Sequence, residues 1–336
     1  MLLVASDPVF AAHDTGRGHP ERAARLDAVT VGVGRSGLDD ALRPLPLRTA
    51  TREELERVHP ADHLDALESL CEDGGGAIDA DTVVSPGSWN AALHAAGAGL
   101  AAIDALDDGD GDAAFLALRP PGHHATPTRA MGFCLLNNIA VSAAALAERG
   151  ERVAIVDFDA HHGNGTQACF EGDGRVLYVS FHQWPLYPGT GRLDEIGRGD
   201  GMGTNCNVPF PPGTTGDVYL SALDEVVGPL VERFAPTWLL ISAGFDGHRA
   251  DPLTGLALSA DDFGLLTARL APLVPAGRRI AFLEGGYDLD ALARSVATTL
   301  PALVGARPPR EEPPSAGGPG HVVVDAVAQL WSELGV

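Results

Sequence analysis

Residues 152–165 read RVAIVDFDAHHGNG, an apolar run that ends in a dense group of polar side chains. The apolar part, 152–157, has no polar alternation, as is typical of a strand buried on both faces of a parallel sheet. Four more β-rich apolar runs occur elsewhere, at 113–118 (AAFLAL), 175–181 (RVLYVSF), 237–242 (TWLLIS) and 279–283 (RIAFL). We therefore expect residues 152–157 to form one of several neighbouring buried strands.

Helical patterns separate or follow these runs, at 134–149, 216–234, 259–272 and after Asp288. Strands that alternate with helices favour a parallel sheet with helices on both faces. The predicted fold class is α/β, a single domain with a mainly parallel sheet. We expect this domain to span residues 1–306, followed by a flexible Pro- and Gly-rich connector at 307–320 and a C-terminal helix at 321–336 that docks on the same domain.

The composition of the 336-residue chain narrows its function. Hydrophobic residues make up 45% of the chain, enough for a sizeable core, and the formal net charge is −22. Because phosphate binding needs clustered Lys and Arg, this charge argues against a nucleic-acid partner. The four cysteines are widely spaced, and no segment approaches the ~20 apolar residues of a membrane helix. We expect a soluble, cytoplasmic protein without a membrane partner, and its oligomeric state stays open.

Four of the predicted strands are followed by polar residues capable of catalysis. In open α/β sheets a ligand site forms outside the carboxyl ends of the strands. The polar groups should therefore meet at one edge of the sheet. They are PGHH at 121–124, DFDAHHGNG at 157–165, SAGFD at 242–246 and EGGY at 284–287.

Two of these groups contain candidate metal ligands. Asp159 and His161 are two residues apart, so on an extended strand end both side chains project to the same side. Asp246, from another strand, would complete a set of two carboxylates and one imidazole. Three protein ligands and a position left for water are the arrangement of a catalytic zinc site. The pattern predicts a hydrolytic metal, zinc by preference, although such a site also accepts iron or cobalt.

The other groups contain candidate acids and bases. Near a metal, a neutral His123 or His124 can take a proton from water and return it to the leaving group. Asp157 and Asn164 are available to orient these rings, and a carboxylate favours the charged imidazole more than an amide does. The histidine with the Asn partner should therefore be the better base. Tyr287, after two glycines, is placed to donate its hydroxyl to a developing oxyanion.

These motifs, preceded by HPER at 19–22, occur in the order shown by the histone deacetylase superfamily, which includes bacterial histone deacetylase-like amidohydrolases and acetylpolyamine amidohydrolases. The resemblance covers residues 13–290 and rests on several independent motifs. It implies an arginase/deacetylase-like fold and zinc-dependent hydrolysis of the acyl amide of lysine, a polyamine or another small amine. Asn at position 164, where many members carry Asp, is similar to the class II-type and bacterial pattern.

By that resemblance, the zinc ligands are Asp159, His161 and Asp246, and Tyr287 polarises the substrate carbonyl. Each tandem histidine takes one partner, His123 with Asp157 and His124 with Asn164. The resemblance also implies a structural monovalent cation, K⁺, beneath the zinc, held by Asp157, Asp159, His161, Ser180 and Phe181.

The remaining implied residues belong to the substrate path. The pocket residues are Gly132, Phe133, Tyr187, Leu253 and Gly285. Phe is commoner than Tyr at position 187, so the added hydroxyl could narrow the channel. Leu253 stands near where polyamine-selective relatives can place an acidic gate, and its lack of charge favours acyl-lysine peptides or small acylated amines over polyamines. Arg22 resembles the arginine that lines an internal product channel.

Two other functions remain open. A binuclear manganese ureohydrolase such as arginase has a similar fold, but its additional carboxylates would stand at Gly163 and His248. A count of metal atoms per chain separates it from a deacetylase with one zinc. The chain could also be an acyl-lysine or polyamine binding module without turnover, although every proposed acid, base, ligand and oxyanion donor is present.

Overall fold

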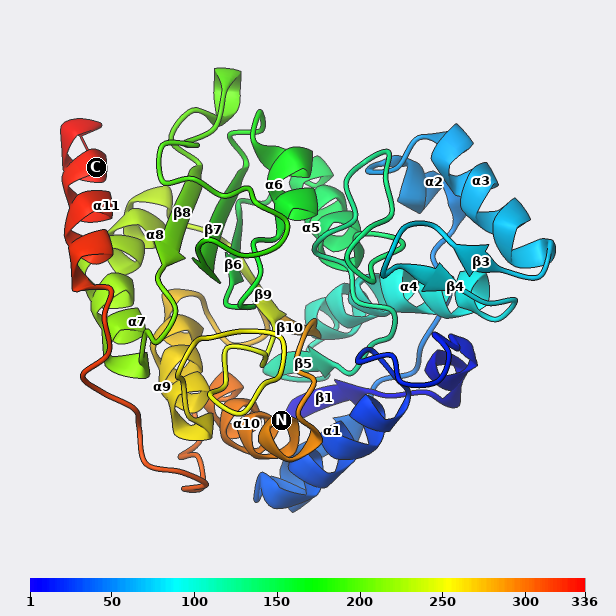
Figure 1. Ribbon diagram of the computed structural model, residues 1–336, viewed down its shortest axis with the longest axis horizontal. Helices are drawn as coiled ribbons and strands as arrows, with labels where there is room; N and C mark the ends of the chain where they lie inside the picture. The colour runs from blue at the N-terminus through cyan, green and yellow to red at the C-terminus, as the bar shows by residue number, and fades with distance from the viewer. Residues whose placement is uncertain (336) are drawn as a thin grey trace.

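A computed structural model describes residues 1–335 of the chain (Figure 1). An eight-stranded sheet runs through it in the order β2-β1-β5-β10-β9-β6-β7-β8, and every neighbouring pair is parallel. The predicted mainly parallel sheet is confirmed. Its strands are β1 (Leu2–Ala5), β2 (Leu42–Pro44), β5 (Ala113–Leu116), β6 (Val153–Asp157), β7 (Val176–Gln183), β8 (Asn205–Phe210), β9 (Trp238–Ala243) and β10 (Arg279–Leu283), and a separate antiparallel pair joins β3 (Gly76–Ala77) to β4 (Val83–Val84).

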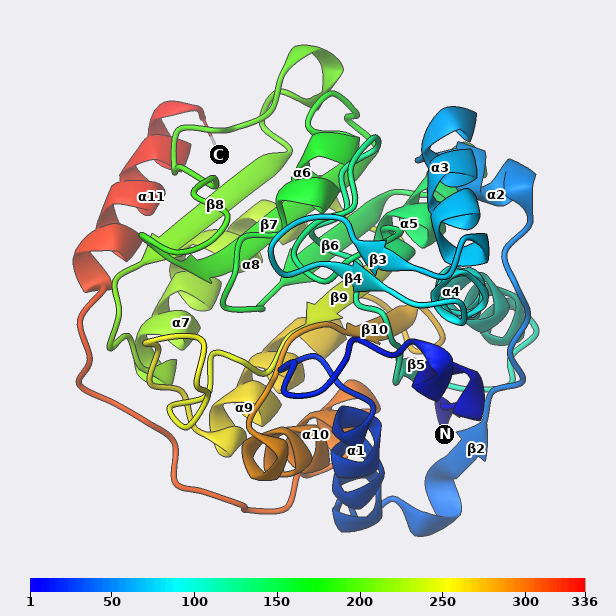
Figure 2. The same ribbon diagram turned by 45° about the vertical axis from the view of Figure 1, so that its right-hand side comes forward.

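Helices cover both faces of the sheet (Figure 2). Side chains alternate between the faces along a strand, so Val153 and Ile155 of β6 join one buried apolar cluster and Ala154 and Val156 join the other. The first cluster receives side chains from α2 (Arg52–Glu56), α3 (Ala61–Glu72), α4 (Ser88–Asp107), α5 (Asn138–Glu148) and α6 (Asn164–Phe170). The second receives them from α1 (Ala24–Arg35), α7 (Gly216–Ala222), α8 (Gly228–Phe234), α9 (Ala260–Leu270), α10 (Leu289–Leu303) and α11 (His321–Glu333).

The observed helices differ from the predicted ones at their boundaries. The helix expected over 134–149 begins at Asn138, because the side chain of Asn137 accepts the N–H of Ala140 and caps it. The helix expected over 216–234 is divided by a π-helical segment, Leu223–Val227, that joins α7 to α8. Short 3₁₀ segments lie at Pro8–Ala12, Asp39–Ala41, Gly199–Gly201 and Ala271–Leu273.

Residues 307–320, the predicted connector, form no helix or strand; we call them the C-terminal strap. The sequence predicts flexibility, but hydrogen bonds tie the strap to the start of α9. The hydroxyl of Ser315 donates to Asp262 at 2.6 Å, and the N–H of Glu311 donates to Asp261 at 2.9 Å. Beyond the strap, α11 lies beside α7 and β8 and buries Val324, Val327 and Trp331. Val336, the last residue of the predicted helix, lies outside the described residues.

The four cysteines are free, in keeping with their spacing in the sequence. Within residues 1–335, no helix combines the length and the apolar character that crossing a membrane requires.

Candidate active site

A pocket of about 330 Å³ opens at the carboxyl ends of the central strands. Each of the four polar groups predicted to meet at this edge is found in it or directly beside it. Six lining residues were predicted from the sequence as pocket or catalytic residues, and His161 as a metal ligand. The lining consists of Pro20, Asp81, His124, Gly132, Phe133, His161, Leu186, Tyr187, Leu253 and Tyr287.

The predicted metal ligands lie together at this pocket. Each of these three residues, Asp159, His161 and Asp246, offers one ligand atom, and the three atoms lie within 4.8 Å of one another. Nδ1 of His161 is 2.8 Å from Oδ2 of Asp246 and 3.3 Å from Oδ1 of Asp159. The N–H groups of Gly285 and Ala160 donate to the two carboxylates, each at 2.8 Å, and hold them in place. The side chains are therefore arranged before any ion binds.

The electrostatics of this cluster fit a cation. Both carboxylates are buried, and burying negative charge is costly without a positive partner. Burial opposes a charge on His161, but its hydrogen bonds and charge interactions with Asp159 and Asp246 prevail and raise its pKa to about 10. Two carboxylate oxygens and one imidazole nitrogen at the base of an open pocket suit one divalent metal ion.

The tandem histidines take separate partners. Nδ1 of His123 is 3.0 Å from Oδ2 of Asp157, and Nδ1 of His124 is 2.8 Å from Oδ1 of Asn164. The hydroxyl of Tyr178, which sequence reasoning missed, also donates to Asp157 at 3.1 Å. These are the pairings that the sequence resemblance implies.

The two partners have opposite electrostatic effects. Burial opposes charge on His123, but the negative charges of Asp159 and Asp157 prevail and raise its pKa to about 10. Burial, with the positive charges of His123 and His161, lowers the pKa of His124 well below its ordinary value. His123 is therefore charged and His124 neutral at neutral pH. This is the charge distribution expected of a site in which His124 is the base.

Tyr287 completes the wall of the pocket opposite these histidines. Burial raises the pKa of its hydroxyl well above the ordinary value, so this group keeps its proton and can donate a hydrogen bond. The guanidinium of Arg25 lies over the Tyr287 ring at 5.1 Å, and the backbone N–H of Tyr287 donates to Asp251 at 2.7 Å. Its loop is therefore fixed from two sides.

The family model for the histone deacetylase domain matches residues 19–303 of this chain. The chain belongs to the histone deacetylase family. It is 41% identical over 287 residues to a probable deacetylase of Archaeoglobus fulgidus, an alignment that covers 84% of this chain and 80% of the relative. It is 40% identical over 287 residues to a histone deacetylase-like amidohydrolase of Pseudomonas aeruginosa, covering 84% of this chain and 74% of that one.

The fold agrees with this assignment. The crystal structure of the HDA15 HD domain superimposes on the chain with a TM-score of 0.90 at 35% sequence identity, and the match covers 99% of this chain and 94% of that one. The histone deacetylase fold thus extends over 99% of the chain, and the motifs at the carboxyl ends of the strands belong to a family of deacetylases and amidohydrolases.

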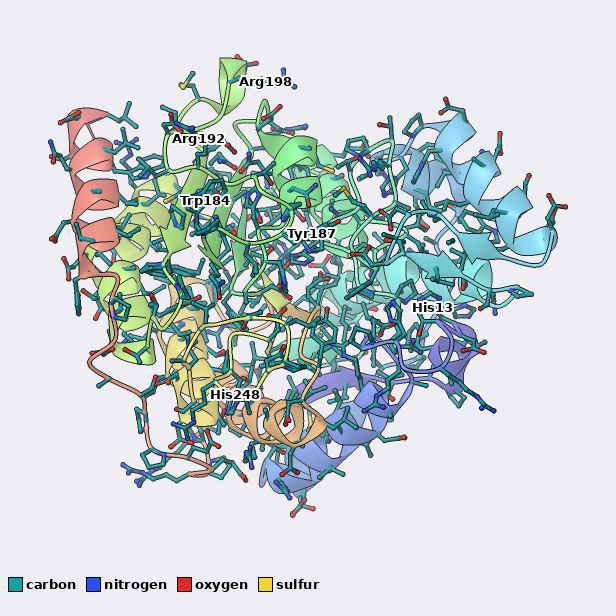
Figure 3. All side chains as sticks on the ribbon, in the orientation of Figure 1. His13, Trp184, Tyr187, Arg192, Arg198 and His248 are labelled. Atoms are coloured by element: carbon teal, nitrogen blue, oxygen red, sulfur yellow. The ribbon has the colours of Figure 1, made fainter. Side chains whose placement is uncertain are left out.

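Four residues predicted as part of the substrate pocket, Gly132, Phe133, Tyr187 and Leu253, line this pocket. The ring centroid of Phe133 lies 5.8 Å from that of Tyr287, and the ring centroid of Tyr187, which is labelled in Figure 3, lies 5.2 Å from that of His124. Gly132 has φ +56°, and a side chain there would collide with the ring of His124. Gly285 differs from this group, because it lies against the candidate metal ligands and is absent from the pocket lining. A Cβ at this position would collide with Oδ2 of Asp246 and lie 2.6 Å from Oδ2 of Asp159, so this close approach, rather than a substrate contact, explains the need for glycine.

The predicted role of Arg22 is wrong. Arg22 is exposed, whereas Arg25, one helical turn later, is fully buried. Arg25 donates from Nε to the carbonyl of Gly286 at 2.8 Å and from Nη2 to the carbonyl of Glu284. Arg25 lies in the first turn of α1, whereas Arg22 precedes the helix, and two arginines three positions apart in sequence do not reveal where the helix begins.

Two further residues at the mouth of the pocket were missed. Asp81, on the loop between β3 and β4, contributes to the lining, and the only sequence signal was its place in an Asp-x-Asp pair with Asp79. His19 accepts the N–H of Glu21 at Nδ1, so its Nε2 donates to the carbonyl of Asp81 at 3.0 Å. Its ring also lies 4.8 Å from that of Phe133. The HPER motif thus supports the rim.

Proposed function

We propose that the chain is a zinc-dependent deacetylase that hydrolyses the acyl amide of a linear amine, with one zinc ion held by Asp159, His161 and Asp246. The observation that carries the proposal is the convergence of a neutral imidazole, a protonated tyrosine hydroxyl and the three candidate ligands in one pocket. Membership of a family of deacetylases and amidohydrolases supports the same reaction.

Each residue of the chain has a definite task in this proposal. Zinc, when bound, supplies Lewis-acid polarisation of the amide carbonyl and makes water more acidic. Because the Asn164 oxygen accepts at Nδ1 of His124, that nitrogen carries the hydrogen and Nε2 is free to take a proton from the attacking water. The water oxygen bonds to the acyl carbon while Tyr287 donates to the oxyanion. His124 then returns the proton to the amine nitrogen as the C–N bond breaks, which gives a carboxylate and a free amine.

The charged His123 stabilises the negative charge that develops beside it. Its partner Asp157 keeps its ring oriented and protonated, so the two histidines have complementary roles. Together with the zinc, these residues would supply the base, the acid and the oxyanion donor that acyl transfer to water requires.

We propose acyl-lysine peptides or small acylated amines, rather than polyamines, as substrates. The rings of Phe133 and Tyr187 and the side chain of Leu253 can enclose an apolar methylene stem, and Leu253 gives no charge to an internal ammonium. The carboxylate of Asp81 at the rim can accept N–H donors of a peptide. The acetyl group is the acyl group proposed.

We further propose a structural K⁺ site made by Asp157, Asp159, His161, Ser180 and Phe181. The parallel register pairs Asp157 of β6 with Ser180 of β7, which supports this set. The free cysteines support a reducing, cytoplasmic location.

The alternative function, that of a binuclear manganese ureohydrolase, has less support. His248 stands where a second metal centre would need a carboxylate, and its Nε2 donates to Glu312 at 2.9 Å. Within residues 1–335, the one group of His, Cys, Asp and Glu side chains arranged to hold a metal ion consists of Asp159, His161 and Asp246.

The test is amine release from an acetyl-lysine peptide and from a monoacetylated polyamine, on protein whose metal content is measured. We expect hydroxamate-sensitive turnover of the peptide with one zinc per chain. Turnover only with two manganese ions per chain would favour a ureohydrolase-like centre. One zinc with no turnover on a broad acyl panel would favour the binding module.

A further inference from the structure

A carboxylate of the C-terminal strap reaches the loop that follows β9. Oε2 of Glu312 accepts hydrogen bonds from Nε2 of His248 at 2.9 Å, from Nη2 of Arg249 at 3.1 Å and from the N–H of Ala260 at 3.2 Å. Its Oε1 lies 3.3 Å from Nε of Arg294 on α10. Glu312 is only 14% exposed, so solvent weakens these contacts less than it weakens those of a surface ion pair. It lies beyond residues 19–303, the part that matches the family model.

The imidazole of His248 connects the strap to a turn. It is 1% exposed (labelled in Figure 3). Its Nδ1 accepts the N–H of Ala250 at 3.1 Å, so Nε2 carries the hydrogen that is donated to Glu312. The carbonyl of His248 accepts the N–H of Asp251 at 2.8 Å. Glu312 therefore fixes the ring orientation of His248, and His248 fixes residues 248–251.

The turn at residues 248–251 supports two residues of the pocket. Oδ2 of Asp251 accepts the N–H of Tyr287 at 2.7 Å, and its Oδ1 accepts the N–H of Leu253 at 3.0 Å. Both Tyr287 and Leu253 line the pocket. A continuous series of hydrogen bonds thus runs from Glu312 through His248 and Asp251 to the tyrosine.

We propose that Glu312 is a positioning residue for the deacetylase site, acting through His248 and Asp251 on the loop of Tyr287. The kinetic effect of this positioning role rests on the proposed function. The strap has other attachments, at Asp261 and Asp262, so removing one carboxylate does not release it. Glu312 therefore orients the oxyanion donor, and the strap is part of the catalytic domain.

The kinetic test compares Glu312→Ala with Glu311→Ala, on an acetyl-lysine peptide and with zinc content matched. Glu311 is the adjacent strap residue, and its carboxylate lies 3.6 Å from Arg35, away from the site. We expect kcat to fall about tenfold in E312A, the scale of a lost charged hydrogen bond, and less than about twofold in E311A. In a Tyr287→Phe background, E312A should cost less than about twofold, because the donor it positions is absent.

A second readout does not depend on turnover. Amide hydrogen exchange at Tyr287 and Asp251 should accelerate about tenfold in E312A and stay unchanged in E311A, since both N–H groups belong to the series. An equal loss of kcat in the wild-type and Y287F backgrounds, or unchanged exchange at both amides, would overturn the proposal. If wild-type protein shows no turnover, the proposed function fails, and the exchange result alone then supports or overturns the positioning role.

Discussion

Replacing Asn164 by Asp should change the pH dependence of hydrolysis through its partner, His124. The two side chains are 2.8 Å apart, and the neutral amide leaves the pKa of His124 well below 6.5, because burial and two neighbouring positive charges dominate. A carboxylate in the same place, with its charge centre about 4 Å from that of the imidazolium, would interact with it by ~4 kcal/mol at an effective dielectric constant of about 20. Carboxylates this close raise a histidine pKa by about 1–3 units.

His124 acts as a base only when it is neutral, so the sign of the effect follows. A higher pKa means that the neutral form is lost at a higher pH, and the acid limb of kcat/KM should move up by about 1–3 units in N164D. Activity that N164D loses at low pH should return as the pH rises through the raised pKa of His124. The assay is a kcat/KM profile for an acetyl-lysine peptide.

Asn164→Ala is the control for that profile. It removes the hydrogen bond without adding charge, so the rate should fall without an upward shift of the acid limb. An N164D profile that is lowered uniformly, with its acid limb unmoved, would refute the assignment of His124 as the base.

Three further predictions concern Tyr287, the buried carboxylate of Glu21 and the C-terminal helix. Tyr287→Phe should lower kcat by roughly 10²–10³ while zinc affinity, measured by chelator competition, stays unchanged; full activity would remove Tyr287 from the mechanism. Glu21 is fully buried, and although burial alone would raise its pKa, its hydrogen bonds and charge interactions with Arg119, aided by Arg25, lower it to about 2. Its stabilising contribution is thus present above its unfolded value of 4.5 and lost as pH falls towards 2. Glu21→Gln should cost about 3–5 kcal/mol of unfolding free energy at pH 7 in urea titrations, because it leaves the arginines without their counter-charge, and the loss should shrink below pH 4.5. Trp331→Ala should cost about 3–5 kcal/mol in the same assay, and an unchanged midpoint would show that α11 adds nothing to the domain.

The strand-end chemistry could be predicted from the sequence because a parallel sheet brings the carboxyl ends of its strands together. Asp159 follows β6, Asp246 follows β9 and Tyr287 follows β10, so spacing and strand order were sufficient. The fold class followed from the same runs. Runs buried on both faces have a strong apolar signal, and β6 is an example.

Elements without that signal were missed. The strand β8 reads NCNVPF, in which asparagines interrupt the apolar pattern, and β2 has only three residues. The helix α4 is rich in small residues and buried around most of its surface, so it lacks the polar face that reveals a helix. Arg25, Asp81 and Glu312 depend on long-range contacts with carbonyl groups, a pocket and a loop, which no local pattern encodes.

The most direct test of the central claim is a zinc titration of metal-free protein, with amine release from an acetyl-lysine peptide measured at each step. We expect no activity without metal, a linear rise to one equivalent of zinc per chain, and no rise in a variant in which Asp246 is replaced by Ala. Full activity of the metal-free protein, or a plateau only at two equivalents, would contradict a single zinc site formed by Asp159, His161 and Asp246.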